Sequence, residues 1–464
     1  MGVRRRAWML AALLGGLFLG NVDTAVANTA IPAIQVGLHA AGVALDLVVS
    51  GYSLAYAALL VTSARLGHHR GHRRTFLLGL SVFTLASVGC GVAPDAWALV
   101  VARIVQAAGA ALMAAQVLTL LQLQFTGPTR ARALGLYTVV LSAGAIVGQV
   151  AGGLLISADL LGAGWRSVFL VNGPAGGLLF VLGVAVLPAD PPGRTGRLDW
   201  TGVLALSAAL LLLVVPLVIG PEQGWHAWTG LCLVLSLPAL AAFHALQRRV
   251  AAAGGRPIID PGLLARRLVA WGAAAIGTTA STYFATLFVV ALYLQRGLGY
   301  TAAASGLALL PWVAAFGLAG PLLPRLSGRG QRQAGPAGAL LMVVGFTGIA
   351  LFAGPARGGL LAGLLGLCGL GYGLAYSALV LQLTRAVAVT HAADLSGLIQ
   401  TASRIGGVVG VAAFGAGYLA LAPAPGPALA VTAFVRIAAA LAVTALAGAA
   451  MAQAAGRAAA PPAG

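Results

Sequence analysis

Long apolar runs alternate with short polar segments along the whole chain. Most runs are 19 to 28 residues long, enough for a helix to cross a hydrocarbon layer of roughly 30 Å. Strands of a membrane barrel would be only about 10 residues long, with apolar and polar positions alternating. The pattern therefore predicts fourteen helical membrane spans, at 7–31, 43–64, 75–94, 97–124, 134–157, 167–187, 201–219, 229–246, 268–294, 303–324, 336–354, 359–384, 397–421 and 428–452.

The composition agrees with this pattern. Hydrophobic residues make up 60% of the 464 positions and charged residues 8%, against about 25% charged residues in ordinary globular proteins. A water-soluble fold needs polar surface to cover its core, and a long disordered region needs charge; this chain lacks both. We therefore expect an all-α polytopic protein whose surroundings are the lipid bilayer.

The position of the charges predicts the orientation. All 27 basic residues are arginines, and with nine acids the net charge is +18. If the N-terminus is cytoplasmic, 21 arginines fall in inner segments and three in outer loops, which is the positive-inside bias. Both termini are then cytoplasmic. No basic region is interleaved with aromatic residues, so we expect no nucleic-acid partner. Arginine without lysine suggests a GC-rich bacterial genome, and hence the bacterial inner membrane.

Two longer polar connections, 188–200 and 247–267, divide the spans into six, two and six. We expect a six-helix bundle at 1–190, an inserted helix pair at 191–250 and a second six-helix bundle at 251–464. The inserted pair has no charge within its spans, so we place it at the periphery. Arg/Gly-rich turns at 64–74 and 324–332 occupy equivalent places in the two halves. Duplicated halves around a central cavity are a transporter architecture.

Asp23 is the one acidic residue deep within a predicted span. A charged carboxylate exposed to lipid costs several kcal/mol, so such a residue is either functional or tied into hydrogen bonds. We interpret Asp23 as a proton carrier or cation site; a purely structural, hydrogen-bonded aspartate is the alternative.

Four motifs follow one another along the first bundle, with the sequences DTAVANTAIP at 23–32, RLGHHRGHRR at 65–74, RIVQAAGAA at 103–111 and GAIVGQVAGG at 144–153. In these motifs the chain resembles the major facilitator superfamily, and within it the fourteen-spanner drug:proton antiporter branch. The resemblance implies the major facilitator fold and a monomer as the working unit.

The resemblance also implies roles for the motif residues. Arg103 and Gln106 match a motif linked to proton transfer, although an interhelical structural bond is the alternative. Gating is implied for the loop residues Gly67, His68, Arg70, Gly71 and Arg73, and for the span residues Gly148, Gly152 and Gly153. Two positions depart from the family: His68 replaces an aspartate that fastens the halves, and Gln149 replaces a proline at a usual kink point.

Aromatic and polar side chains within spans are candidates for the substrate cavity. They are Asn28, Tyr52, Tyr56, Gln149, Tyr283, Trp312 and Tyr376. Aromatic walls suit flat apolar or cationic molecules through stacking and cation–π contact. Each aromatic side chain has a packing or lipid-facing role as its alternative. Arg404 and Arg436 also lie within spans, where we expect them to pair near the inner face or to line water; the sequence assigns neither one a specific partner.

We interpret the chain as an alternating-access exporter of small amphipathic or cationic molecules, a drug or antibiotic, in exchange for protons. A metabolite facilitator or proton symporter of the same fold is the alternative, and a non-transporting scaffold is a remote one. Enzymatic chemistry has no candidate constellation, and the cysteines Cys90, Cys232 and Cys368 lie in apolar runs without metal spacing. We therefore expect no enzyme activity, no cofactor and no metal.

Overall fold

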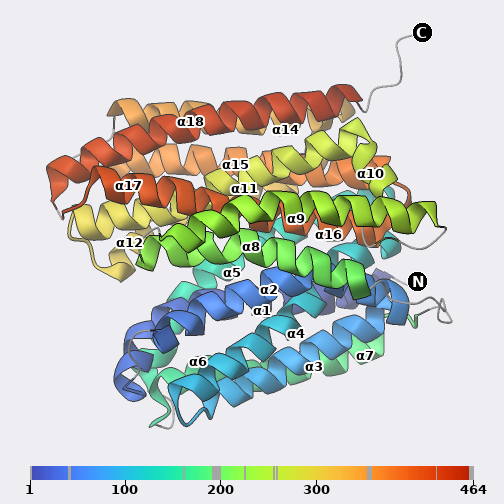
Figure 1. Cartoon of the computed structure of the whole chain (residues 1–464), viewed down its shortest axis with the longest axis horizontal. Coiled ribbons are helices and arrows are strands. Elements are labelled where there is room, and N and C mark those ends of the chain that lie inside the picture. The colour runs from blue at the N-terminus through green and yellow to red at the C-terminus, as the bar shows by residue number, and fades with distance from the viewer. Residues whose placement is uncertain are drawn as a thin grey trace.

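The computed structural model describes residues 3–39, 43–159, 162–190, 200–223, 226–253, 257, 260–352, 358–424 and 426–458. These ranges are helical and contain no β-strand, which confirms the all-α prediction. Most helices run side by side along the long axis of the molecule (Figure 1).

The helices fall into three consecutive groups. The first holds α1 (Val3–Gly37), α2 (Val43–Arg70), α3 (His72–Gly91), α4 (Ala96–Gln124), α5 (Gly127–Ala158), the 3-10 turn η2 (Gly164–Arg166), α6 (Ser167–Leu170) and α7 (Asn172–Val186). The second is the pair α8 (Trp200–Gln223) and α9 (Ala227–Ala252). The third holds α10 (Pro261–Ala265), α11 (Arg267–Leu292), the π-helix η3 (Tyr293–Gly297), α12 (Ala302–Ala308), α13 (Leu310–Leu322), η4 (Leu323–Arg325), α14 (Gly328–Phe352), α15 (Gly358–Ala386), η5 (Val389–His391), α16 (Ala392–Gly410), the π-helix η6 (Val411–Gly415), α17 (Ala416–Leu421) and α18 (Pro427–Ala458).

Each of the fourteen expected apolar segments coincides with one helix or with a short run of helices in these groups. Ten stretches of the described residues are long and apolar enough to cross a membrane, judged by length and composition. The count of fourteen spans and the cytoplasmic position of the termini stay predictions.

The first and third groups repeat one packing pattern. In the first, α1 packs on α5 and α7, and α4 packs on α2 and α3; in the third, α11 packs on α16 and α18, and α15 packs on α13 and α14. Small residues permit the closest approaches. Gly79 on α3 and Gly109 on α4 face each other's backbone, and a Cβ at either position would meet main-chain atoms.

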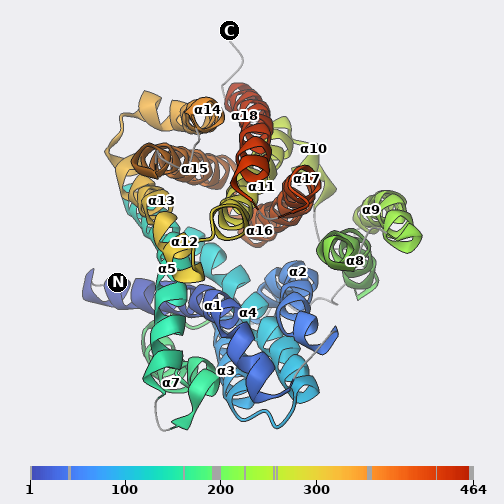
Figure 2. The same ribbon diagram turned by 90° about the vertical axis from the view of Figure 1, so that its left-hand side faces the viewer.

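The two groups meet where α5 packs on α13 and α2 packs on α16. The pair α8–α9 lies at the side of the molecule, where α8 contacts α2 and α16 (Figure 2). The boundary expected near residue 190 adjoins residues outside the described ranges. The three-part division at 1–190, 191–250 and 251–464 stays a prediction.

Candidate functional site: a buried carboxylate beside a central cavity

Asp23 on α1 is buried and receives three side-chain hydrogen bonds. Arg103 on α4 donates to Oδ2 at 2.6 Å, and Gln106, one turn further along α4, donates to Oδ1 at 2.8 Å. Asn172, the first residue of α7, donates to Oδ1 at 2.9 Å. Three helices therefore converge on one carboxylate, which is how a buried charge is tolerated in an apolar interior.

Arg103 is itself enclosed on several sides. Its guanidinium also donates to the Gln106 side chain at 2.8 Å and to the Val48 carbonyl on α2 at 3.3 Å. The Tyr52 ring lies against its plane, 4.1 Å from ring centroid to guanidinium carbon, and the Phe169 ring lies at 5.6 Å. The structure thus brings together the three residues for which proton coupling was predicted, Asp23, Arg103 and Gln106, and their coupling role itself stays a prediction.

The sequence interpretation missed the part played by Asn172. Its amide also donates to the Ser87 hydroxyl at 2.9 Å, and Ser87 donates to the Phe169 carbonyl at 3.0 Å. A short hydrogen-bonded chain therefore links the carboxylate to α3 and to the start of the α6–α7 segment. An amide isolated in an apolar run was the available signal, but nothing in its spacing pointed to Asp23.

A cavity lies beside this cluster, between the two groups of helices. Its walls come from α1, α2, α4 and α16, and its lining residues are Leu17, Gly20, Asn21, Thr24, Tyr52, Tyr56, Ala110, Met113, Ala114 and Arg404. The space that water-sized molecules can occupy is about 20 Å³. Tyr52 and Tyr56, both predicted substrate residues, stack with ring centroids 6.3 Å apart. Arg404 places its guanidinium carbon 4.3 Å from the Tyr56 ring centroid.

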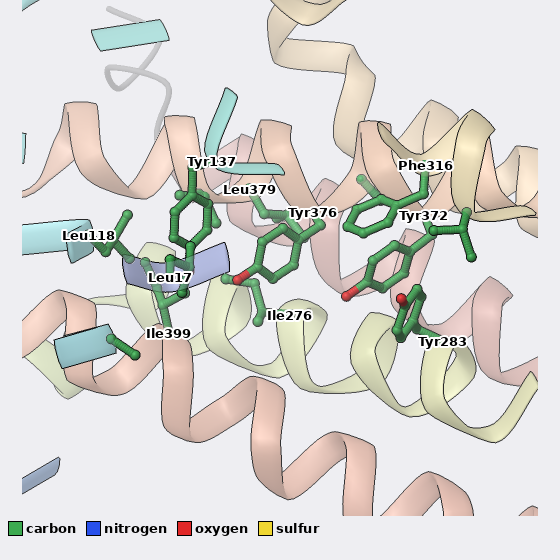
Figure 3. Close-up of a cluster of buried hydrophobic side chains, with 14 of the residues drawn as sticks. Leu17, Leu118, Tyr137, Ile276, Tyr283, Phe316, Tyr372, Tyr376, Leu379 and Ile399 are labelled. Atoms are coloured by element: carbon green, nitrogen blue, oxygen red, sulfur yellow. The ribbon is translucent and has the colours of Figure 1, made fainter. Parts of the chain in front are cut away.

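The other predicted aromatic residues lie in a second buried cluster, in the second bundle, and Tyr376 connects it to Tyr137 of the first bundle. Tyr283 on α11 stacks on Tyr372 of α15 at 4.4 Å and contacts the Trp312 ring at 5.8 Å. Tyr376 stacks on the other side of Tyr372 at 5.9 Å. Figure 3 shows these tyrosines following one another towards Tyr137. Tyr283, Trp312 and Tyr376 are buried and are not among the cavity-lining residues. A role in binding stays a prediction for them.

The predicted gating loop is a sharp break between α2 and α3. Gly71 has a backbone φ of +98°, a conformation that residues other than glycine rarely adopt. The Asp190 carboxylate fills the space in front of it and accepts the backbone N–H groups of Arg73 at 2.9 Å and Arg74 at 3.0 Å. The Arg73 guanidinium donates to the Val184 carbonyl at 2.7 Å. Asp190 therefore caps α3, a residue that the sequence interpretation did not single out.

The remaining loop residues differ in their surroundings. A Cβ at Gly67 would meet the Gln116 amide, whose Oε1 accepts a hydrogen bond from Nδ1 of His72 at 2.7 Å. The His68 ring lies edge-on to His72, with centroids 6.5 Å apart, and Arg70 is exposed. Gly67 thus allows the close packing of α2 on α4, whereas the structure gives Arg70 no comparable enclosed position.

The glycines of α5 divide between two faces. Gly148 and Gly152 lie against α1, where an added Cβ would meet Ala25 and Val22 in one case and Thr29 and Val26 in the other. Gly153 faces open space. The first two glycines therefore set the approach of α5 to the helix that carries Asp23.

Two predicted substrate residues, Asn28 and Gln149, have side chains outside the described part of the structure.

Hydrogen bonds and an ion pair join the two bundles at the arginine-rich end of the molecule. Arg65 on α2 pairs with Asp394 on α16 at 2.8 Å, and Arg65 also donates to the Pro257 carbonyl. Gln122 on α4 donates to Ser396 at 2.9 Å. The interface continues where Gln400 donates to the Ala114 carbonyl at 3.0 Å, Arg130 to the Thr384 carbonyl at 3.0 Å, and Thr138 shares a hydrogen bond with Ser377 at 2.8 Å. We call the Arg65–Asp394 pair, with Gln122–Ser396, the latch.

Comparison with known proteins decides the family. The model of the Major Facilitator Superfamily matches residues 13–411. The chain belongs to this superfamily. Membership confirms the predicted superfamily and its transporter class, which acts on small molecules in the membrane, whereas the fourteen-span branch stays a prediction.

Several proteins that are similar to this chain have names that refer to transport or export. The chain is 33% identical over 417 residues to the probable actinorhodin transporter of Streptomyces coelicolor, covering 89% of this chain and 72% of that protein. It is 36% identical over 404 residues to the cephamycin export protein CmcT of Amycolatopsis lactamdurans, covering 85% and 81%. The human organic anion transporter MFSD10 (TETRAN) has a similar fold, with a TM-score of 0.67 at 13% identity over 97% of this chain and 100% of that one.

Proposed function

We propose that the chain is a drug:proton antiporter of the fourteen-span branch, which exports small amphipathic molecules across a bacterial inner membrane by alternating access. The relatives named above, one of them an export protein by name, support the class of cargo. The repeated packing of the two bundles around one cavity supports alternating access.

The observation that carries the proposal is the buried cluster of Asp23 with its three donors. Protonation of Asp23 removes the negative charge that Arg103 is paired with, and leaves a guanidinium in an apolar interior. The cluster joins α1 and α4, which both wall the cavity, to α7, so its rearrangement moves two helices of the cavity wall. A local change of charge is thereby converted into a change of bundle position.

The energetics are sufficient for one proton per cycle. One charge that crosses 100 mV releases about 2.3 kcal/mol, and a tenfold concentration gradient requires about 1.4 kcal/mol. A single proton exchanged for a neutral molecule therefore sustains a gradient of more than tenfold. With one carboxylate in the cluster, we propose a stoichiometry of one.

The other predicted residues take roles consistent with this scheme. Tyr52 and Tyr56 contact the cargo, and the Tyr283, Trp312 and Tyr376 cluster forms the wall that cargo meets when the bundles separate. The turn at Gly67–Arg73, with His68 and Arg70, and the Gly148–Gly153 segment of α5 act as hinges and gates. The bundles work as a monomer.

The test is transport in everted membrane vesicles energised by a proton gradient, with a panel of fluorescent dyes of each charge. Wild type is compared with Asp23→Asn and with Asp95→Asn at matched expression. Asp95 is a suitable control because it caps α4 at an exposed position, where its side chain accepts from the Ala98 N–H at 2.9 Å. We expect a protonophore and Asp23→Asn each to abolish dye uptake, and Asp95→Asn to preserve it. Uptake that survives both the protonophore and Asp23→Asn would refute proton coupling.

One observation favours an uncoupled facilitator of the same fold as the second candidate. Asp23 is 2% exposed, fully hydrogen-bonded and not among the cavity-lining residues, as a purely structural ion pair would be. In that case dye would equilibrate across the membrane without accumulation, and the protonophore would leave its movement unchanged.

A further inference from the structure

Arg404 carries the single formal charge among the side chains that line the cavity in the described part of the chain. It reaches the cavity from α16 in the second bundle, whereas the other lining residues come from α1, α2 and α4 in the first. The cavity therefore has a wall of apolar, aromatic and uncharged polar side chains on one side, the polar ones being Asn21 and Thr24, and a guanidinium on the other.

No acidic side chain of the described residues lies within 4.0 Å of the Arg404 guanidinium. The groups that interact with it electrostatically are phenols, those of Tyr56, Tyr52, Tyr137, Tyr372 and Tyr376, and none of them is a carboxylate. Asp23 does not supply a negative charge to Arg404, because its carboxylate is hydrogen-bonded to Arg103, Gln106 and Asn172. An arginine inside the membrane without a carboxylate partner is a functional site by default.

The aromatic rings that would suit a cationic cargo are already engaged by the protein's own cations. Arg103 lies on the Tyr52 ring at 4.1 Å, and Arg404 lies on the Tyr56 ring at 4.3 Å. A cation that approaches this stacked pair meets a neighbouring guanidinium, whereas an anion is attracted to it.

From these contacts we infer that the cavity recognises the anionic group of an aromatic cargo, a carboxylate or ionised phenol, on Arg404, with the ring against Tyr56. The inference rests on the proposed export function and names its cargo class. A planar guanidinium matches a carboxylate through two parallel hydrogen bonds, which a lysine or an amide does not reproduce.

The position of Arg404 on α16 links cargo to the latch. Ser396, Gln400 and Arg404 follow one another at intervals of four residues, so they share one face of the helix. The first two bind α4 of the first bundle, and the third reaches the cavity. Gly406 faces the Gly277 backbone without room for a Cβ, which holds α16 against α11. Cargo on Arg404 therefore lies next to the contacts that keep this end closed.

The cavity volume shows that cargo binding requires a further opening. The space that water-sized molecules can occupy is about 20 Å³, far below the roughly 300–1,000 Å³ of pockets that hold drug-sized ligands. Because Arg404 and the tyrosine pair belong to different bundles, a small separation of the bundles enlarges the cavity between the guanidinium and the rings.

The test measures equilibrium binding to the purified full chain in lipid nanodiscs, with three probes that share one ring system. These are anthracene carboxylate, its neutral methyl ester and the cation anthracene methylamine. We expect wild type to bind the carboxylate at least tenfold more tightly than either analogue. Arg404→Gln should reduce carboxylate affinity to that of the ester and leave ester affinity unchanged, while Arg404→Lys should retain part of the preference. Unchanged ester binding shows that the variants are folded.

Arg436→Gln is the matched control, because Arg436 is an exposed arginine on α18 that does not line the cavity. It should bind all three probes as wild type does. Tighter binding of the methylamine, a carboxylate preference that survives Arg404→Gln, or no binding of the carboxylate would overturn the inference.

Binding requires no gradient, so this inference and the proposed antiport fail separately. Proton-driven dye transport without carboxylate preference refutes only the cargo class. An Arg404-dependent preference without proton-driven transport refutes only the antiport.

Discussion

The latch offers a direct test of how the two bundles are held together. Arg65 and Asp394 are 2.8 Å apart, and their side chains are 14% and 9% exposed. Exposed ion pairs contribute about 0–1 kcal/mol, and breaking a fully buried pair costs about 3–5 kcal/mol. This pair lies between those limits, so we expect Asp394→Asn to weaken closure by about 1–3 kcal/mol. The population opened at this end should then rise roughly 5- to 150-fold.

Alkylation of a cysteine placed at Ser396 measures that population. Ser396 is buried and bonded to Gln122 across the interface, so a thiol there reacts with a maleimide only when the bundles part. Cys232 is replaced by Ser in the background, since it is partly exposed, whereas Cys90 and Cys368 are buried and are kept. We expect Asp394→Asn to accelerate alkylation at least fivefold.

A double-mutant cycle isolates the pair itself. Arg65→Gln combined with Asp394→Asn should react no faster than the more reactive single variant, because the same interaction is lost. Asp95→Asn is the control: Asp95 is an exposed carboxylate that caps α4, where it accepts from the Ala98 N–H at 2.9 Å. Unchanged alkylation in Asp394→Asn, or fully additive effects in the cycle, would refute the idea that this ion pair closes the end.

Two further expectations concern stability, measured by thermal unfolding of the purified protein. Asp190→Ala removes the cap of α3 and should lower the free energy of unfolding by about 0.5–2 kcal/mol, and Asp190→Asn should lower it less. Equal melting temperatures for wild type and both variants would contradict the capping role. Gly152→Ala should lower the free energy of unfolding by about 1–3 kcal/mol, because the added methyl group pushes α5 away from Thr29. Gly153→Ala, with nothing near its Cβ, should leave the free energy of unfolding unchanged or raise it by up to about 1 kcal/mol. The reverse order of the two variants would contradict the assigned faces of α5.

The helices and the membrane class could be read from the sequence, because length and hydrophobicity of a run are local properties. The runs at 97–124 and 359–384 coincide closely with α4 (Ala96–Gln124) and α15 (Gly358–Ala386). The boundaries moved most where polar residues continue a helix beyond its apolar part. The run expected at 134–157 begins at Gly127 in the structure, because Pro128 suits a first helical turn and Arg130 finds partners at Phe125 and Thr384.

Part of the site was visible in the same way. Asp23, Arg103 and Gln106 stand out as polar groups in apolar runs, and their positions and motifs predict a shared role in proton coupling. The sequence also shows that His68 stands where the family motif has an aspartate. The carboxylate that caps α3 in this turn, Asp190, could not be predicted, because it comes from the far end of the first bundle and meets the turn only through the packing of α7 on α3.

The contacts of Asn172 and Arg404 could not be predicted from the sequence, because only the packing of the helices creates them. Asn172 is 149 residues from Asp23 in sequence, and Arg404 meets Tyr56 only because α16 packs on α2. Hydrophobic runs specify that helices form, but they are nearly uniform around each helix and do not specify which faces meet. Close contacts at small residues, such as Gly406 with Gly277, set those faces. The charge that the cavity presents to its cargo therefore follows from helix packing.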